Sequence, residues 1–354
     1  MRQLGKVEMS DISVGAGLLG AGGGGAVSEG LKMVDRVLGF GESVGLIDAD
    51  EVGDDDWGAV IAGMGSPVAS RKRPRTYSLT WAMELLGETL GFEPKFVIPF
   101  ELGAGNSISP MLVAIQMGIP VVNGDPVGRA VPQIDMTTFH LGGIDISPLA
   151  LVNEDKISAV IRTGTPYDME RVARAVSAEL GSVVAVACYS MSGADMKRLI
   201  IRDTTTLVEN IGITMRTARE SGADVAQAVI DGYDGYLLGK GTVTVMESET
   251  KKGFDFAHVQ VEGDLPIQIG VQNENLVAHR GDQLVAVVPD LICAISDKGM
   301  PLSNAEIEVG QKITYVGFKA HPMFRTQAAF DLFATALGVL EYDAGFVPIE
   351  GLGN

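Results

Sequence analysis

The sequence has few cysteines, and it has no long uninterrupted hydrophobic run. Cys188 and Cys293 are too few and too far apart for a disulfide framework or a paired-cysteine metal site. The longest apolar run, residues 284–295, is interrupted by Pro289 and Asp290, which argues against a membrane span. The first residues are polar and lack the apolar segment of a secretory signal. We therefore expect a cytoplasmic protein.

Positive charge is also scarce. There are 27 lysines and arginines against 45 acidic residues, which gives a formal net charge of −18. Nucleic acids and anionic membranes are bound mainly through lysine and arginine, so we expect neither as a partner. We expect a small-molecule substrate instead. The one basic run, Arg71-Lys-Arg-Pro-Arg75, is short, and we interpret it as a solvated loop rather than an anion-binding lip.

Apolar residues and glycines are abundant. The chain of 354 residues is 46% hydrophobic and contains 45 glycines, enough for a large core and many tight turns. We predict an α/β fold in two domains. Residues 1–153 form an N-terminal domain with a mostly parallel sheet and βαβ units, and residues 154–354 form an α+β domain that ends in a β-rich, mostly antiparallel part. The apolar content and the β-rich second half also lead us to expect a homo-oligomer.

One βαβ unit is predicted over residues 95–125. The pattern predicts a strand to Phe100, a glycine-containing loop, a helix over about 107–118 and a second strand to Asn123. Successive strands of such a unit run parallel, so Glu101 and Asp125 should meet at the same edge of the sheet. Ligands of open α/β sheets bind at that edge, which makes the two carboxylates candidate site residues.

A run of glycines at positions 20–25 separates two predicted helices. Ser10 or Asp11 is expected to cap the first helix, which ends near Leu19, and the second helix is expected over residues 27–38. A helix precedes the glycines and no Gly-Lys-Ser/Thr follows them, so neither a dinucleotide fingerprint nor a P-loop is indicated. Two interpretations remain: a tight helix–helix corner, or a cradle of backbone amides that faces an anion or a polar ring substituent. We favour the cradle, made by Gly22, Gly23, Gly24 and Gly25.

The segment that follows the second strand is rich in ionisable and hydroxyl groups. It is either a loop that folds over the strand edge and supplies acid–base and ligand groups, which we favour, or a surface loop whose side chains cap the backbone. No HxH or HExxH pattern occurs, yet the carboxylates and the histidine can assemble a metal site in three dimensions, so a divalent metal remains open. The polar residues of this segment, which follows the second strand, are Asp125, Arg129, Asp135, Thr137, Thr138 and His140.

Two further segments carry polar or nucleophilic groups. Cys188 follows an apolar strand where a nucleophile can sit, but buried free cysteines usually only pack, and packing is our prediction. Ser190 lacks a GxSxG elbow, so a serine hydrolase triad is not indicated. The Gln272-Asn-Glu-Asn275 run is either a hydrogen-bonded turn or a ligand contact through Asn273.

Several motifs, in order along the chain, resemble the S-methyl thiohydantoin desulfurase family, often associated with hydantoinase and oxoprolinase proteins. The resemblance covers about residues 8–345, and the motifs together are more specific than any one alone. They are LLGAGGGG (18–25), GMGSP (63–67), PFELGAGNS (99–107), NGDPVGRAVPQIDMTTFH (123–140), SMSG (190–193), QNENLVA (272–278) and VPDLICAIS (288–296).

The resemblance implies hydrolysis of an S-methyl thiohydantoin to a hydantoin with loss of methanethiol. Glu101 or Asp125 would then act as general base, and His140 would donate a proton, with Asp135 completing the catalytic set. The glycine amides and Asn106 would position the ring. Arg129 would pair with a carboxylate on the substrate. Thr138 and Asn273 complete the expected binding set.

Two alternatives stay open beside this reading. One is a non-catalytic subunit that binds hydantoin-like ligands for a hydantoinase or oxoprolinase partner. The other is a hydrolase that opens a hydantoin or lactam ring and releases no sulfur. No cofactor is indicated with certainty.

Overall fold

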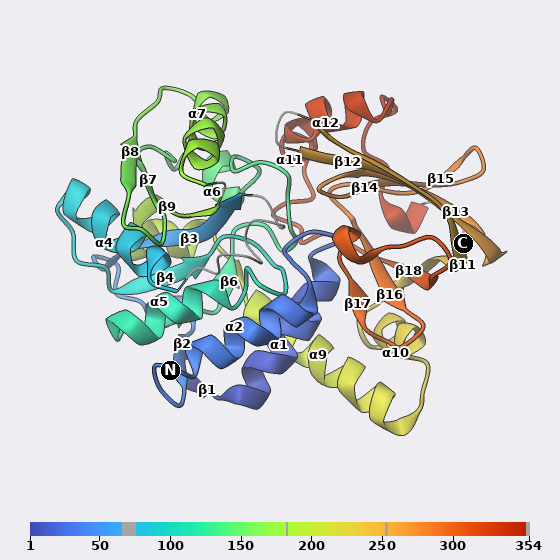
Figure 1. Cartoon of the computed structure of the whole chain (residues 1–354), viewed down its shortest axis with the longest axis horizontal. Coiled ribbons are helices and arrows are strands. Elements are labelled where there is room, and N and C mark those ends of the chain that lie inside the picture. Colours follow the sequence, from blue (N-terminus) through green and yellow to red (C-terminus); the bar gives the residue numbers. More distant parts are fainter. Residues whose placement is uncertain (66–75, 182, 252–253, 352–354) are drawn as a thin grey trace.

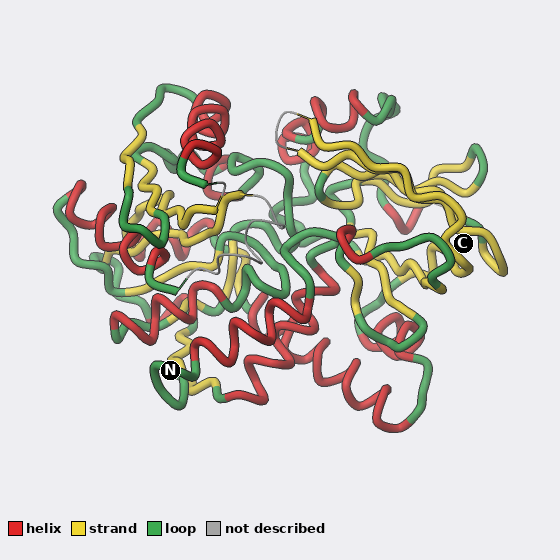
Figure 2. Tube along the Cα trace, viewed as in Figure 1, coloured by secondary structure: helices red, strands yellow, loops and turns green. Residues whose placement is uncertain are grey.

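The computed structural model describes residues 1–65, 76–181, 183–251 and 254–351. Two eight-stranded sheets occupy opposite halves of the molecule, and helices lie between and below them (Figure 1; strands are yellow in Figure 2). The basic run at 71–75 falls outside the described residues. Within the described part of the chain, no helix combines the length and the apolarity needed to cross a membrane.

The first sheet has the strand order β1-β2-β5-β4-β3-β9-β7-β8. Strands β2, β5, β4 and β3 pair in parallel, and the flanking pairs are antiparallel. The predicted α/β class with a parallel core is confirmed. The strands are β1 (Arg2–Leu4), β2 (Val44–Ile47), β3 (Trp57–Gly65), β4 (Phe96–Pro99), β5 (Val121–Val122), β7 (Leu149–Val152), β8 (Ser158–Ile161) and β9 (Val183–Ser192).

Both faces of this sheet are buried, as its apolar strands require. Neighbouring residues of β3 alternate between two cores: Ala59 and Ile61 join one, and Val60 joins the other. In β4, Val97 and Ile98 divide in the same way. The helices that flank the sheet are α1 (Lys6–Leu19), α2 (Val27–Val37), η1 (Ala49–Glu51), α4 (Ser78–Leu90), α5 (Ser109–Met117), α6 (Thr138–Leu141), α7 (Pro166–Glu179) and α8 (Gly193–Leu199).

The predicted βαβ unit is confirmed as β4, α5 and β5. Val97 of β4 pairs in parallel with Val121 of β5. Helix α5 ends at Gly118, whose φ of 71° is left-handed and whose amide donates to the Ala114 carbonyl. The loop after β4 and the short strand β6 (Gly124–Asp125) after β5 therefore leave the sheet at the same edge. Strand β6 pairs with β10 (Ile201–Arg202).

The start of α1 differs from the prediction. The helix begins at Lys6, and its cap is Gly5, whose amide donates to Glu8 Oε2 at 2.9 Å. The expected caps, Ser10 and Asp11, lie inside the helix. The acidic side chain of Asp11 instead pairs with Arg216, 2.9 Å away. The glutamate at the third position of the helix satisfies the amide of the capping residue, so the helix begins before the expected serine or aspartate cap.

Helix α1 crosses α9 (Thr204–Ser221) at very short range. A Cβ on Gly15 would lie 1.8 Å from the Val208 carbonyl oxygen, and one on Gly212 would lie 1.9 Å from that of Asp11. Only glycine permits this backbone approach. Through it, the N-terminal helix is fixed against a helix from the second half of the chain. Helix α10 (Val225–Gly232) follows α9.

The second sheet is antiparallel throughout and has the order β15-β14-β13-β12-β11-β18-β16-β17. This confirms the predicted antiparallel part. Its elements are β11 (Tyr236–Lys251), β12 (Phe254–Leu265), β13 (Ile267–Gln272), β14 (Glu274–Arg280), β15 (Gln283–Val287), β16 (Leu291–Ser296), β17 (Pro301–Leu302), η2 (Asn304–Glu306), β18 (Lys312–Phe318), α11 (Gln327–Leu332), α12 (Ala334–Val339) and η3 (Ile349–Gly351).

Strands from both sides of position 153/154 share the first sheet. Strand β7, which ends at Val152, pairs with β8 and with β9. The division into domains at 153/154 stays a prediction.

Candidate functional site

Glu101 lies directly after β4, at the carboxyl edge of the parallel strands. Its side chain is only 7% exposed. Oε1 accepts a hydrogen bond from Asn106 Nδ2 at 2.7 Å, and Oε2 accepts one from the Val131 amide at 2.8 Å. The first bond closes the loop after β4, and the second ties that loop to the segment after β6. Glu101 is therefore held in one orientation by two fixed donors.

The glycine run between α1 and α2 packs against this loop. A Cβ on Gly24 would lie 2.4 Å from Gly103 Cα, and the Gly24 carbonyl accepts from the Gly105 amide at 3.0 Å. Gly22 and Gly24 have φ values of 94° and 71°, which favour glycine. The run is thus a tight corner that backbone from the Glu101 loop approaches closely.

The other neighbours of the run come from the second half of the chain. A Cβ on Gly23 would lie 2.1 Å from Glu274 Oε1, and one on Gly22 would lie 2.4 Å from Asn304 Nδ2. The Gly22 carbonyl accepts from the Asn304 amide at 2.8 Å. The groups against the run are therefore a carboxyl and an amide of the protein itself. A ligand role for these glycines stays a prediction.

Glu274 is the residue that the predicted site lacked. It begins β14 and is only 4% exposed, and its Oε2 has no hydrogen-bond partner among the described residues. It stands inside the QNEN run, of which only Asn273 had been singled out. One signal in the sequence could have pointed to Glu274: it is an acidic residue between two apolar strands. Acidic residues are seldom buried, so a buried one is unusual.

Glu101 and Glu274 interact electrostatically across the glycine run. Burial raises the pKa of Glu101 well above its usual range, and the neighbouring Glu274 carboxylate raises it further. Burial also raises the pKa of Glu274, to about 8, against the opposing effect of Arg129 and then Arg174. Two buried carboxyls that repel each other share a proton more readily than both ionise.

Arg129 is fully buried and is bonded to main-chain carbonyls. Nε donates to Ala130, Nη1 donates to Pro289 and Asp290, and Nη2 donates to Asn275, all at 2.9–3.1 Å. Burial lowers the pKa of Arg129, while Glu274 raises it. These contacts favour a structural role that joins the two halves of the chain. Pairing with a substrate carboxylate, the predicted role, is left to experiment.

Asp125 is fully buried on β6. Its Oδ1 accepts from the amides of Val127 and Gly128, both at 2.7 Å, so it shapes the turn that follows. Burial raises its pKa to about 6, against the lowering effect of the Thr204 hydroxyl and those amides. The Asp125 carboxylate also raises the pKa of Glu101. The predicted meeting of these two carboxylates at one strand edge is thus found.

Asp135, Thr138 and His140 lie farther along the same segment. Burial raises the pKa of Asp135, and the nearby His140 lowers it. The Thr138 hydroxyl donates to the Leu199 carbonyl at 2.7 Å, and the half-buried His140 stands in the short helix α6. Asp135 and His140 are thus electrostatic neighbours, whereas the neighbours of Glu101 are Glu274 and Asp125.

Asn273 has the geometry of the hydrogen-bonded turn, the first of the two interpretations of the QNEN run. Its φ is 56°, its Oδ1 accepts from the Asp255 amide at 2.9 Å, and its carbonyl accepts from Asn304 Nδ2 at 2.9 Å. It joins the β13–β14 turn to the β12 hairpin and to η2. Whether it also contacts a ligand stays a prediction.

The two cysteines are buried and free. Burial raises the pKa of Cys188, which packs in the core as predicted. Burial also raises the pKa of Cys293, to about 12, although Arg129 opposes that shift. Neither thiol is ionised at neutral pH. Within the described ranges, no three or more His, Cys, Asp or Glu side chains are grouped to hold a metal ion.

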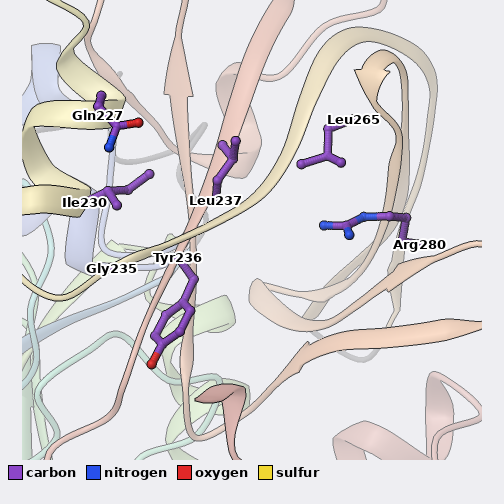
Figure 3. Close-up of a pocket in the computed structure, with 7 residues that line it drawn as sticks. All are labelled: Gln227, Ile230, Gly235, Tyr236, Leu237, Leu265 and Arg280. Carbon is purple, nitrogen blue, oxygen red and sulfur yellow. The ribbon is translucent and has the colours of Figure 1, made fainter. Parts of the chain in front are cut away.

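Two shallow hollows occur elsewhere on the surface. One, of about 410 Å³, lies beside the Asp11–Arg216 ion pair. The other, of about 390 Å³, lies between α10 and the second sheet, where Arg280 and Leu265 face Gln227 and Ile230 (Figure 3). No predicted site residue lines either hollow, so the buried cluster around Glu101 is the candidate site.

Comparisons with known proteins agree with the fold. An X-ray crystal structure of a protein from Chromobacterium violaceum superposes with a TM-score of 0.87 at 22% sequence identity, covering 99% of this chain and 100% of that one. No curated protein matches. Residues 7–163 match the family model described as S-Me-THD-like, N-terminal domain, and residues 164–349 match the S-Me-THD-like, C-terminal domain. The chain therefore belongs to the S-Me-THD-like family.

Proposed function

We propose that this protein is a hydrolase of a small planar heterocycle and that it converts an S-methyl thiohydantoin to a hydantoin and methanethiol. Water adds to the ring carbon that bears sulfur, and the C–S bond breaks. One proton of the water ends on the ring nitrogen and the other on the thiolate. The S-Me-THD-like family membership and the chemistry of the Glu101 cluster together support this reaction.

The observation that carries the proposal is the Glu101 carboxyl itself. It is buried at the edge of the sheet where α/β folds bind ligands, and Asn106 and the Val131 amide fix its orientation. Burial raises its pKa well above the usual range, a shift that is common among catalytic carboxyls. Acid–base chemistry on a neutral ring is the reaction class that this environment serves.

Glu101→Gln tests the proposal. Purified protein is given an S-methyl thiohydantoin, and released methanethiol is measured with a thiol reagent. Because the amide keeps the shape but cannot accept a proton, turnover should fall by about 10²–10⁴-fold, and circular dichroism checks that the variant is folded. Glu93→Gln is the matched control, since Glu93 is exposed and pairs only with the exposed Lys95 at 2.6 Å among the interactions seen in the described chain.

The outcomes separate the alternatives. Thiol release that Glu101→Gln leaves at the wild-type rate would contradict the role of Glu101. Wild-type protein that releases no thiol would contradict the desulfurase reaction. Consumption of the hydantoin ring would then indicate a ring-opening hydrolase, and hydantoin binding without turnover would indicate a binding subunit for a hydantoinase or oxoprolinase.

A further inference from the structure

The proposed reaction needs two proton transfers at one ring carbon. Attack by water requires a group that accepts a proton, and the ring nitrogen requires a group that gives one. Breaking the C–S bond then requires the reverse pair of transfers, to the leaving sulfur and from the new hydroxyl. A single carboxyl cannot hold both states at once, so a second proton-exchanging group must face the same carbon.

We propose, building on the function above, that Glu274 is the second catalytic carboxyl and that it shares one proton with Glu101. Its side chain comes from β14 of the second sheet, and the glycine run brings it to the Glu101 loop. Gly23 contacts Glu274, and the adjacent Gly24 contacts Gly103 of that loop. The pair therefore spans the two halves of the chain.

The hydrogen bonds of Glu274 differ from those of Glu101. Both Glu101 oxygens accept hydrogen bonds, from Asn106 and from the Val131 amide. Oε2 of Glu274 is buried and has no partner within the described chain. A buried carboxyl oxygen without a partner is costly, and it becomes satisfied when it carries a proton toward a ligand acceptor or receives one from a ligand donor.

The surrounding charges suit a pair that carries one negative charge. Around Glu274 these are Glu101, Arg129 and Arg174, and around Glu101 they include Asp125. Arg129 and Arg174 stabilise an ionised Glu274. Repulsion between the two glutamates opposes ionisation of both. The pair therefore carries at most one negative charge, and one carboxylate beside one carboxylic acid is the state that the proposed mechanism uses.

The proton balance closes over one turnover. The carboxylate takes a proton from water as its oxygen bonds to the ring carbon, while the acid gives its proton to the ring nitrogen. The former acid, now a carboxylate, then takes the hydroxyl proton as the carbonyl forms. The former base, now protonated, gives its proton to methanethiolate as the C–S bond breaks. Both glutamates return to their starting states.

Glu274→Gln tests this role through activity. We expect kcat/KM for thiol release to fall by about 10²–10⁴-fold. The double variant Glu101→Gln/Glu274→Gln should have a rate within about 3-fold of the slower single variant. The reason is that substitutions of residues that act as a unit do not have additive effects. Glu93→Gln again serves as the control. An active wild-type enzyme whose Glu274→Gln variant stays within about 3-fold of it would overturn the inference while the proposed function stood.

A second readout does not depend on turnover. In protein with ¹³C-labelled glutamate side chains, the Glu101 carboxyl is titrated by NMR in wild type, in Glu274→Gln and in the control. Loss of the neighbouring carboxylate should lower the pKa of Glu101 in Glu274→Gln alone. An unchanged Glu101 titration would overturn the shared proton. If wild type released no thiol, a lowered Glu101 pKa would still support the pair, although the proposed reaction had failed.

Discussion

Gly23→Ala measures how tightly the glycine run holds Glu274. The new Cβ would lie 2.1 Å from Glu274 Oε1 and 2.7 Å from both Cδ and Cγ. Gly23 is not in the left-handed region, so the substitution adds no backbone strain. Its cost is therefore the displacement of one buried glutamate.

The expected cost is about 1–3 kcal/mol, the usual penalty for one extra carbon in a packed interior. Urea unfolding followed by circular dichroism measures it as a lower midpoint. Gly164→Ala is the matched control, because nothing lies within 4 Å of its new Cβ and its φ is not left-handed. We expect the control to stay within about 0.5 kcal/mol of wild type.

A double-mutant cycle assigns the cost to Glu274. In a Glu274→Ala background the three clashing atoms are gone, so adding Gly23→Ala should cost close to nothing. The coupling free energy should then equal the cost of Gly23→Ala in the wild-type background. The reasoning is refuted if Gly23→Ala is as stable as wild type, or if it costs the same in both backgrounds.

Two further predictions concern the buried charges. Arg129→Met should destabilise the protein by about 3–5 kcal/mol in urea unfolding, because buried carbonyls of both halves lose a charged donor. A raised KM with unchanged unfolding would instead indicate that Arg129 binds the substrate. Asp125 has a pKa of about 6 in the fold against 3.8 for the free side chain, so the folded state binds more protons between these values. Stability should therefore fall as pH rises from 4 to 6, and Asp125→Asn should reduce that slope in urea unfolding at stepped pH; an unchanged slope would contradict the assignment.

Much of the first sheet and part of the site were predictable from local pattern. The βαβ unit was visible because a helix between two apolar strands forces them parallel, and this also placed Glu101 and Asp125 at one edge. The helix expected over residues 27–38 was also predictable, and α2 spans Val27–Val37. The start of α1 was not, because Glu8 accepts from the Gly5 amide ahead of the expected caps, and the Asp11 carboxylate pairs with Arg216 instead of capping the helix.

The glycine run shows why local pattern was insufficient for the rest of the site. Its glycines predicted a tight corner and favoured a ligand cradle, but the groups packed against it come from distant segments. Gly23 meets Glu274 and Gly22 meets Asn304, and both depend on how the second sheet packs on the first half. The same packing encloses Arg129 in main-chain carbonyls, where the family resemblance implied a partner for a substrate carboxylate.

The sequence by itself determined the fold class, the parallel strand edge and the presence of Glu101 there, because these follow from short-range periodicity and connectivity. Only the tertiary structure brought Glu274 to Glu101, since long-range packing through Gly15, Gly212 and the glycine run sets that meeting. Burial, which the sequence does not reveal for a single carboxylate, then raises the pKa of both glutamates.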